Sequence, residues 1–565
     1  MNRSRVCFRT GIAVLALCLA LPVFGAKPHQ TIEPGFVLGE TLVLPSPDLS
    51  KLKMEDAKSE GGPWRYGIQI PVEGLVLGAK GFGQWHRGEE GLLHWSVDLM
   101  APAARTLDFH FAKLSLPEGA SLAIRGEGPG NERLILPEDL YGDEYWSPYV
   151  AGERATLLLS VPAKERHLVE LELGSVTHGY RGLFESVDPM QKSGSCNIDV
   201  ACDAGNDWHD QMRSVGQYTF SKSGSSYVCT GTLMANTGVT ATPYFLTANH
   251  CVNTSTVASS VVVYWNYQGY HCRAAGSSAS GTPINKSIAS HSQSGATLRA
   301  TYAPSDFTLL QLSSTPAAAA SPFWSGWSRS TTAPTSSRGI HHPAGHEKRI
   351  SVDNHALTVS GYGGGSGSTH WRVGNWELGT TEGGSSGSGL WDQNKRLVGQ
   401  LHGGSAACGN SLSDYYGRFS VSWTGGGTNA TRLSNWLDPG NTGVTTRNGY
   451  QYSSFYQNAG NFTINDHSTV ESPISISNRS GNAPTALRVS VRISHSYIGD
   501  LKVDLIAPNG NVHVLHNRAN GNTRNLFRTY TVNASASAAN GTWKLRVNDN
   551  ANGDTGFIDA WSLQF

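Results

Sequence analysis

A run of glycine and serine at residues 382–388, EGGSSGS, is where this sequence of 565 residues first suggests chemistry. Such a run is typical of a flexible linker, but the same letters also fit a serine nucleophile on a tight glycine turn. The stretch that follows, LWDQNKRLVGQLHGG, is a hydrophobic run of the kind found inside a folded core. Because a linker would lack such a flank, we interpret Ser386 as a candidate nucleophile within a domain.

Two further stretches supply the partners that a serine hydroxyl needs, since it is a weak nucleophile without a nearby base. PYFLTANHC, residues 243–251, places His250 directly after an apolar strand, and APSDFTLLQL, residues 303–312, places Asp306 at the head of another. A lone histidine is usually structural, and an aspartate before a strand is usually a turn cap. The order His, Asp, Ser within one unit instead predicts a base, an orienting carboxylate and a nucleophile.

The N-terminus and the cysteines both indicate an exported protein. MNRSRVCFRT carries three arginines, and the apolar stretch after it ends at Gly25 and Ala26, which is the pattern of a signal peptide over residues 1–26. Two cysteines fall inside it. The others predict three disulfides whose pairing the residues alone leave open, and none has the spacing of a zinc knuckle, so we expect no metal there. They are Cys196, Cys202, Cys229, Cys251, Cys272 and Cys408.

Charge narrows the class of partner. Lys+Arg and Asp+Glu both number 43, so the chain has no excess of positive charge with which to bind nucleic acid. After the signal peptide no stretch is apolar enough to predict a transmembrane segment.

Alternating apolar and polar runs predict a mainly β protein in three parts. Residues 27–192 are β-rich and carry no motif with a chemical role, and their last stretch, ESVDPMQK, is polar enough for a processing site. Residues 193–450 favour a double β-barrel, with GRFSVSW (417–423) expected as a strand and RLSNWLDP (432–439) as a short closing helix. Residues 455–565 predict a separate β-sandwich.

The middle part resembles the bacterial lysyl endopeptidases, which are trypsin-like serine peptidases. The motifs that carry this resemblance span nearly the whole part and are SGSCNIDV, YFLTANHC, VVVYWNYQ, SDFTLLQL, EGGSSGSG, GQLHGG and SDYYGR. Residues 27–192 resemble, more loosely, the propeptide of these enzymes. The last part resembles a P/Homo B domain through HSYIGDLKVDLIAPNG, GTWKLRVNDN and GDTGFIDAWSLQF. The resemblance implies a chymotrypsin-like double β-barrel.

The resemblance also implies roles for the catalytic residues. His250 would be the base, Asp306 would orient it, and Ser386 would attack, because GSSG aligns with the family's G-x-S-G. The backbone N–H groups of Gly384 and Ser386 would then bind the developing oxyanion. Position 385 is serine where trypsin has the aspartate that captures its new N-terminus, so activation is expected to act differently, for instance by unblocking the cleft. The implied disulfides are Cys229–Cys251, Cys202–Cys272 and Cys196–Cys408.

Substrate choice is expected to depend on a buried carboxylate, since an unpaired buried ammonium is prohibitively costly. Thr380 stands six residues before the nucleophile, where trypsin has its aspartate, and cannot serve. The resemblance supplies Asp414 in SLSDYYGR instead. It also implies an aromatic ring stacked on His402, for which this chain has Tyr362 in place of the family's tryptophan.

These observations together predict a secreted serine endopeptidase that cuts protein and peptide substrates after lysine. It is expected to be a monomer that requires no cofactor, made as a zymogen that cleaves itself between Lys192 and Ser193. An enzyme that accepts both arginine and lysine would share every catalytic residue, and a secreted adhesin with a degenerate peptidase-like middle is the alternative from another class. Four aspartates near turns of the last part are candidate calcium ligands, although solvated turn carboxylates are the favoured reading: Asp500, Asp504, Asp549 and Asp554.

Overall fold

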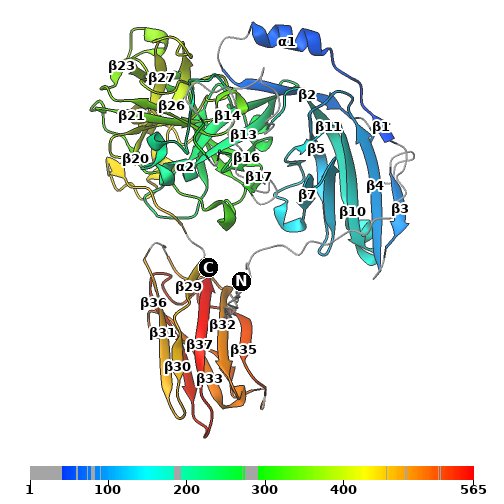
Figure 1. Ribbon diagram of the computed structural model, residues 1–565, viewed down its shortest axis with the longest axis vertical. Helices are drawn as coiled ribbons and strands as arrows, with labels where there is room; N and C mark the ends of the chain where they lie inside the picture. Colours follow the sequence, from blue (N-terminus) through cyan, green and yellow to red (C-terminus); the bar gives the residue numbers. More distant parts are fainter. Residues whose placement is uncertain are drawn as a thin grey trace, which may run out of the picture. The chain divides into compact units, whose positions relative to one another are not determined.

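The computed structural model describes residues 41–565 except for 59–61, 73, 78–82, 89–90, 184–192, 270, 274–290, 453–454, 478, 480, 520 and 522. The predicted signal peptide and Lys192 therefore lie outside the described residues. The chain is mainly β, as predicted, and its strands form the three parts shown in Figure 1. No helix within the described ranges has the length and apolar character needed to cross a membrane.

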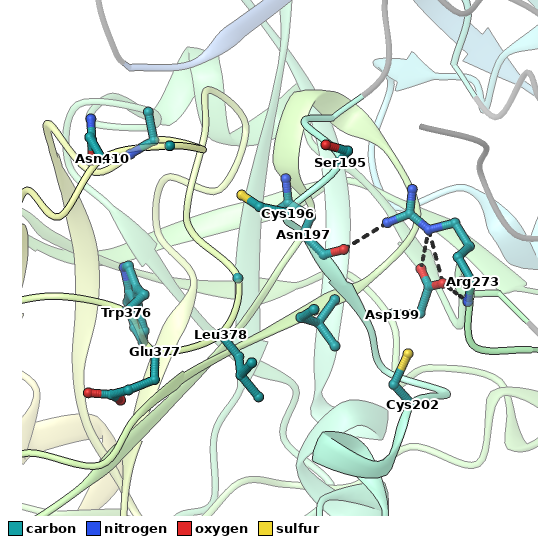
Figure 2. A pocket seen from close by; sticks show the side chains of 14 residues that line it. Ser195, Cys196, Asn197, Asp199, Cys202, Arg273, Trp376, Glu377, Leu378 and Asn410 are labelled. Atoms are coloured by element: carbon teal, nitrogen blue, oxygen red, sulfur yellow. Dashed lines mark hydrogen bonds and ion pairs between the residues drawn. The ribbon is translucent and has the colours of Figure 1, made fainter. Parts of the chain in front are cut away.

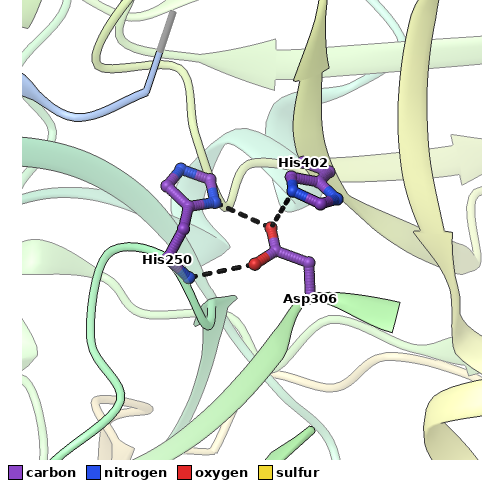
Figure 3. A group of neighbouring side chains, drawn as sticks. All are labelled: His250, Asp306 and His402. Carbon is purple, nitrogen blue, oxygen red and sulfur yellow. Dashed lines mark hydrogen bonds and ion pairs between the residues drawn. The ribbon is translucent and has the colours of Figure 1, made fainter. Parts of the chain in front are cut away.

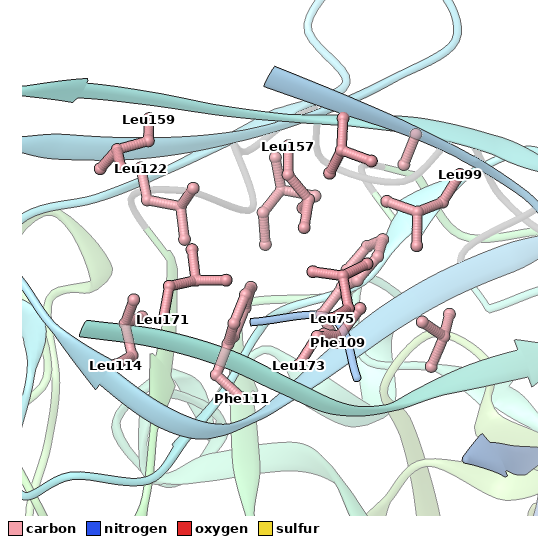
Figure 4. Packing of buried hydrophobic residues seen from close by; sticks show 14 of the residues in the cluster. Leu75, Leu99, Phe109, Phe111, Leu114, Leu122, Leu157, Leu159, Leu171 and Leu173 are labelled. Atoms are coloured by element: carbon pink, nitrogen blue, oxygen red, sulfur yellow. The ribbon is translucent and has the colours of Figure 1, made fainter. Parts of the chain in front are cut away.

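The first part, the N-terminal sandwich (residues 41–183), consists of two layers of strands around an apolar core. Its elements are β1 (Thr41–Val43), α1 (Leu49–Ala57), β2 (Trp64–Pro71), β3 (Gln84–Arg87), β4 (Leu92–Met100), β5 (Thr106–Ser115), β6 (Ser121–Gly126), β7 (Glu132–Ile135), β8 (Tyr145–Trp146), β9 (Val150–Ala151), β10 (Arg154–Pro162) and β11 (Glu170–Gly179). One layer has the order β1-β4-β10-β6-β7, and the other contains β2-β11-β5. Alternate residues of each strand point inward, so Leu99 and Leu157 from one layer face Phe109 and Leu173 from the other (Figure 4).

The second part, the double-barrel segment (residues 193–450), contains two groups of mainly antiparallel strands. The first group is β13 (Val215–Lys222), β14 (Ser225–Leu233), β15 (Tyr244–Ala248), β16 (Val262–Trp265), β17 (Ser292–Ser294), β18 (Ala296–Tyr302) and β19 (Phe307–Leu312). The second is β12 (Ile198–Asp199), β20 (Trp327–Ser328), β21 (Ser337–His341), β22 (Arg349–Asp353), β23 (Thr358–Ser360), β24 (His370–Val373), β25 (Gly389–Asp392), β26 (Leu397–Gly404), β27 (Asp414–Arg418) and β28 (Thr446–Arg447). In this second group β20 and β26 form a parallel pair. Short helices α2 (His209–Ser214) and α3 (Ser255–Ser259) precede strands of the first group.

The end of the double-barrel segment confirms one predicted element and corrects another. The short helix expected at 432–439 is present as α6 (Ser434–Leu437). The strand expected over 417–423 is wrong, because β27 ends at Arg418 and the chain continues as helix α5 (Phe419–Thr424). One helical turn brings the rings of Phe419 and Trp423 together on Trp327, with centroids 5.6 and 4.7 Å from it. Packing against this buried tryptophan outweighs the preference of the residues in this segment for a strand.

The N-terminal sandwich and the double-barrel segment share a sheet, which the sequence did not predict. Strand β2 pairs antiparallel with β14, with Ile68 opposite Ser225 and Trp64 opposite Val228. The edge of the first group of barrel strands is therefore covered by a strand from the preceding segment, which satisfies backbone groups that an open edge would leave to solvent.

The third part, the C-terminal sandwich (residues 455–565), has its own core, as predicted. Its strands are β29 (Phe455–Asn458), β30 (Phe462–Ile464), β31 (Thr469–Ile476), β32 (Leu487–His495), β33 (Leu501–Ile506), β34 (Val512–Asn517), β35 (Leu526–Val532), β36 (Gly541–Asp549) and β37 (Gly556–Gln564). They form sheets of order β29-β37-β32-β35 and β31-β36-β33-β34. Trp543 and Trp561 are buried between them.

Candidate active site

Strand pairing brings His250 and Asp306 together. β15 is a buried apolar strand that ends at Ala248, and β19 is another that begins at Phe307; these two residues are opposite each other in the antiparallel pair. His250 follows the end of the first strand and Asp306 precedes the start of the second, so both emerge at the same edge. Asp306 closes a short 3-10 turn with a left-handed backbone, φ 53°.

The Asp306 carboxylate holds the His250 residue at two points. Its Oδ2 lies 2.8 Å from His250 Nδ1, and its Oδ1 accepts the His250 backbone N–H at 2.9 Å (Figure 3). Because a carboxylate accepts, Nδ1 carries the proton and Nε2 is left as the basic nitrogen. His250 Nε2 is buried without a hydrogen-bond partner among the described residues. The imidazole is thus oriented and has a lone pair free to accept a proton.

Ser386 lies on a turn that packs against the end of β15. Gly384 and Gly387 both have positive φ, 91° and 82°, which only glycine adopts readily. A Cβ added to Gly387 would come within 2.8 Å of the Ala248 backbone nitrogen, and Thr230 of β14 donates its N–H to the Ser386 carbonyl at 2.9 Å. These close contacts place Ser386 next to the segment that carries His250.

The turn gives its two adjacent serines different surroundings. Ser385 is buried, and its Oγ lies 2.8 Å from His341 Nδ1, whose pKa burial lowers to about 3. Ser386 Oγ has no hydrogen bond to another described residue, and neither do the backbone N–H groups of Gly384 and Ser386. The arrangement therefore leaves one hydroxyl and two neighbouring donors available to a substrate.

His402 contacts the pair from the side, under a tyrosine ring. The Tyr362 and His402 rings are stacked with centroids 3.6 Å apart, and His402 Nε2 lies 3.9 Å from Asp306 Oδ2. His370, which the sequence did not single out, lies behind this stack with Nε2 3.0 Å from His402 Nδ1. Burial, and next the charge of His402, lowers the pKa of His370 to about 4. His370 therefore holds the His402 ring, although nothing in the local sequence THW marks it.

Asp414 is a buried carboxylate held by two side-chain hydrogen bonds. Its Oδ2 accepts hydrogen bonds from Trp376 Nε1 at 2.7 Å and Thr381 Oγ1 at 2.8 Å, while Oδ1 has no partner among the described residues. A Cβ added to Gly404 would collide with Oδ1. Burial raises the pKa of Asp414 to about 6. One carboxylate oxygen is therefore held in place, while the other makes no hydrogen bond within the described residues; the backbone of Ala406 acts on the carboxyl to lower its pKa, against the effect of burial.

The three disulfides of the double-barrel segment are those that the resemblance implied. They join Cys196 to Cys408, Cys202 to Cys272 and Cys229 to Cys251. A hollow of about 360 Å³ lies beside two of them, bordered by residues 195–199, 202, 273, 376–379, 407 and 409–410. There Arg273 binds the Asp199 carboxylate and the Asn197 carbonyl oxygen (Figure 2). None of the lining residues belongs to the group around His250.

Two segments of the chain match known protein families. Residues 190–417 match the family described as the lysyl endopeptidase C-terminal domain, and residues 484–565 match the proprotein convertase P-domain. The lysyl endopeptidase of Pseudomonas aeruginosa is 32% identical over 290 residues, covering 50% of this chain and 60% of that protein. Leupeptin-inactivating enzyme 1 of Streptomyces exfoliatus is 48% identical over 112 residues, covering 20% of this chain and 26% of that enzyme. The chain thus spans less than two thirds of the length of these relatives.

Solved structures also match part of the chain. Glu endopeptidase in complex with MPD is 19% identical with a TM-score of 0.24, covering 37% of this chain and 85% of that one. The thermostable serine protease AL20, from an extremophilic microorganism, is 13% identical with a TM-score of 0.26, covering 37% and 91%. The sequence matches thus show that residues 190–417 are similar to the lysyl endopeptidase C-terminal domain, and that residues 484–565 are similar to the proprotein convertase P-domain.

Proposed function

We propose that this chain is the secreted precursor of a serine endopeptidase that hydrolyses peptide bonds on the carboxyl side of lysine. The observation that carries the proposal is the His250–Asp306 pair beside the turn of Ser386. His250 Nε2 takes the proton as Ser386 Oγ attacks the substrate carbonyl carbon, and returns it to the leaving amine. A water molecule, activated by His250 in the same way, then attacks the acyl group on Ser386 and releases it. The N–H groups of Gly384 and Ser386 bind the oxyanion in both steps.

The preference for lysine is supported by the unpaired Oδ1 of Asp414. An ammonium group that enters a buried pocket needs a carboxylate within reach, and this oxygen is buried and unpaired among the described residues. Mapping the peptides in a digest made by the purified protein tests the proposal. Nearly all new C-termini should be lysine; equal numbers of arginine would identify an enzyme of dual preference, and no cleavage would contradict the peptidase itself.

The proposal that the chain is made as a zymogen is supported by contacts of Trp64 from the N-terminal sandwich. A Cβ added to Gly345 would lie 3.1 Å from the Trp64 ring, and one added to Gly383, on the turn of Ser386, would lie 3.8 Å from it. Arg181 covers the ring at 5.0 Å from its centroid. Together with the pairing of β2 and β14, these contacts hold the preceding segment against the nucleophile turn.

We expect the mature enzyme to begin at Ser193, because a lysine-specific enzyme can cut behind Lys192 itself. N-terminal sequencing of the secreted protein checks the start. The Ser386→Ala precursor, expressed without helper proteases, should stay uncut, since it lacks the nucleophile. Adding mature wild-type enzyme should then cut that precursor at the same bond, which controls for access. Unaided processing of the variant would contradict self-cleavage.

The C-terminal sandwich is expected to be dispensable for cleavage of small substrates, because it has its own core and none of the proposed catalytic residues. A truncation after Tyr452 keeps Tyr450 and Tyr452, whose rings pack on Trp324. It should hydrolyse a lysyl ester with a kcat/KM within a few-fold of the full chain. A truncation that also removes the two tyrosines should secrete poorly. A secreted protein that ends at Tyr452 and is inactive would contradict the prediction.

We propose no cofactor for the reaction and a monomeric enzyme. In the C-terminal sandwich, Asp504 is bound by Arg546 at 2.9 Å and Lys502 at 3.4 Å, so it is occupied by cations of the chain itself. Burial, and next the negative charges of Asp549 and Asp554, raises the pKa of Asp500. With Asp504 set aside, Asp500, Asp549 and Asp554 are the candidate calcium ligands of this sandwich that remain from the sequence.

A further inference from the structure

The residue that would begin the mature enzyme is already buried and surrounded by polar groups. Ser193 is 2% exposed, and its backbone nitrogen donates to His346 Nδ1 at 2.7 Å. The next nitrogen along the chain, that of Gly194, donates to Glu382 Oε1 at 2.8 Å, and Asn197 Nδ2 donates to the same oxygen at 2.7 Å. Chain ends are normally solvated and poorly ordered, so this burial calls for a physical reason.

The Ser193 nitrogen has one acceptor of its own, and the nitrogen next to it along the chain contacts a carboxylate. His346 Nδ1 accepts, so it carries no proton and has a lone pair directed at that nitrogen. The Ser193 hydroxyl is buried with no partner among the described residues. Arg349, the cation that acts on Glu382, is itself bound by Asp199 and by Glu347 at 3.2 Å. A second positive charge beside Glu382 would therefore find a carboxylate not taken up by Arg349.

Both receiving groups lie on the loops that shape the oxyanion site. Glu382 begins the turn of Ser386, and its carbonyl oxygen accepts the Ser385 N–H at 2.9 Å. His346 ends the short turn Pro343–Gly345, in which Ala344 donates its N–H to the Gly383 carbonyl at 2.7 Å. A shift of either side chain would move the backbone from which the Gly384 and Ser386 N–H groups project.

We propose that cleavage behind Lys192 converts the Ser193 amide nitrogen into an α-ammonium group that binds His346 Nδ1 and pairs with Glu382, which fixes the nucleophile turn in its active arrangement. The inference rests on the proposed function. Hydrolysis of that one bond adds water, leaves a carboxylate on Lys192, and gives Ser193 a protonated amine with three donors in place of one. Trypsin-like activation uses a carboxylate directly before the nucleophile; here Ser385 occupies that position, and the carboxylate lies three residues earlier.

The Ser193 segment is well anchored to receive this change. Cys196 is joined to Cys408, and Arg273 binds the Asn197 carbonyl oxygen at 2.9 Å (Figure 2). The new chain end is thus held within a few residues of a disulfide, which limits the entropy lost when it binds. Glu382 and His346 act here as positioning residues, because they touch the chain end and the loops rather than the substrate.

The experiment moves the chain end by one residue without altering any described residue. The double exchange Gln191→Lys with Lys192→Gln shifts the cut so that the mature chain begins one residue earlier and Ser193 keeps an amide nitrogen. We expect kcat on a lysyl ester to fall about 10- to 100-fold, the usual worth of a hydrogen-bonded charge. Glu382→Gln, which keeps an acceptor for Gly194 and removes the charge, should cause a similar fall.

A variant that combines the shifted cut with Glu382→Gln tests whether the Ser193 ammonium and Glu382 interact or whether the two changes lower kcat independently. If the ammonium and Glu382 act together, the combined variant is no slower than either alone. Full activity of the shifted enzyme, or losses that multiply, would overturn the proposal. Sequencing and fluorophosphonate labelling of wild type come first. A wild type that is unlabelled refutes the proposed function and this inference with it. A labelled wild type that does not start at Ser193, or a correctly started one whose variants are unaffected, refutes this inference alone.

Discussion

Replacing Ser386 with alanine is expected to lower kcat about a million-fold, which is the typical cost of losing the nucleophile of such a triad. The fold should be unchanged, because Ser386 Oγ makes no hydrogen bond within the described part of the chain. A fluorophosphonate probe should label wild type at Ser386 and leave the variant unlabelled. Urea unfolding of both proteins should give the same free energy within about 0.5 kcal/mol.

Ser385→Ala is the matched control, since the two serines are adjacent but differ in their contacts. Ser385 Oγ is buried against His341 Nδ1, so its removal leaves an unsatisfied ring nitrogen and should cost about 1–3 kcal/mol of unfolding free energy. Labelling at Ser386 should persist. Activity retained by Ser386→Ala, or labelling at Ser385 in wild type, would assign the nucleophile elsewhere.

The positions of His250 and Asp306 could be predicted because each lies at the end of a strong local signal. Both follow or precede a buried apolar strand, and two such strands that pair antiparallel bring their adjoining ends together. The choice between Ser385 and Ser386 needed the family's motif, because two identical neighbours give no local difference. The structure supplies the physical difference, which is the contact of Ser385 with His341, 44 residues away in the chain.

Contacts between distant segments could not be predicted from local patterns. Trp376 and Thr381 both bind Asp414, yet a tryptophan and a threonine in a loop carry no signal of that role. No local sequence pattern predicts the pairing of β2 with β14 either, since any exposed strand edge can accept another strand. The aromatic and β-branched residues of Phe419–Thr424 favour a strand, but their packing on Trp327 makes the segment a helix.

The second large effect is expected at Asp414. Asp414→Asn keeps one oxygen to accept from Trp376 and Thr381 but removes the charge that a lysine side chain would meet at Oδ1. We expect lysyl substrates to lose about 3–5 kcal/mol of transition-state stabilisation, because the substrate ammonium would be buried without a counter-charge. Asp392→Asn is the control, since it removes another buried carboxylate, one that accepts only N–H groups of its own turn. Kinetics on lysyl, arginyl and neutral peptides measure both variants.

The pH dependence of the same reaction gives a test that does not rely on a substitution alone. Burial raises the pKa of Asp414 to about 6, so in the free enzyme the carboxyl is charged above that pH and neutral below it. Only the charged form attracts an ammonium group. The ratio of kcat/KM for a lysyl substrate to that for a neutral substrate should therefore fall as pH decreases through 6. Taking the ratio cancels the titration of the catalytic groups, which affects both substrates equally. In Asp414→Asn this ratio should be low and constant with pH. A ratio that stays flat in wild type, or lysine cleavage that survives in Asp414→Asn, would show that another group selects the substrate.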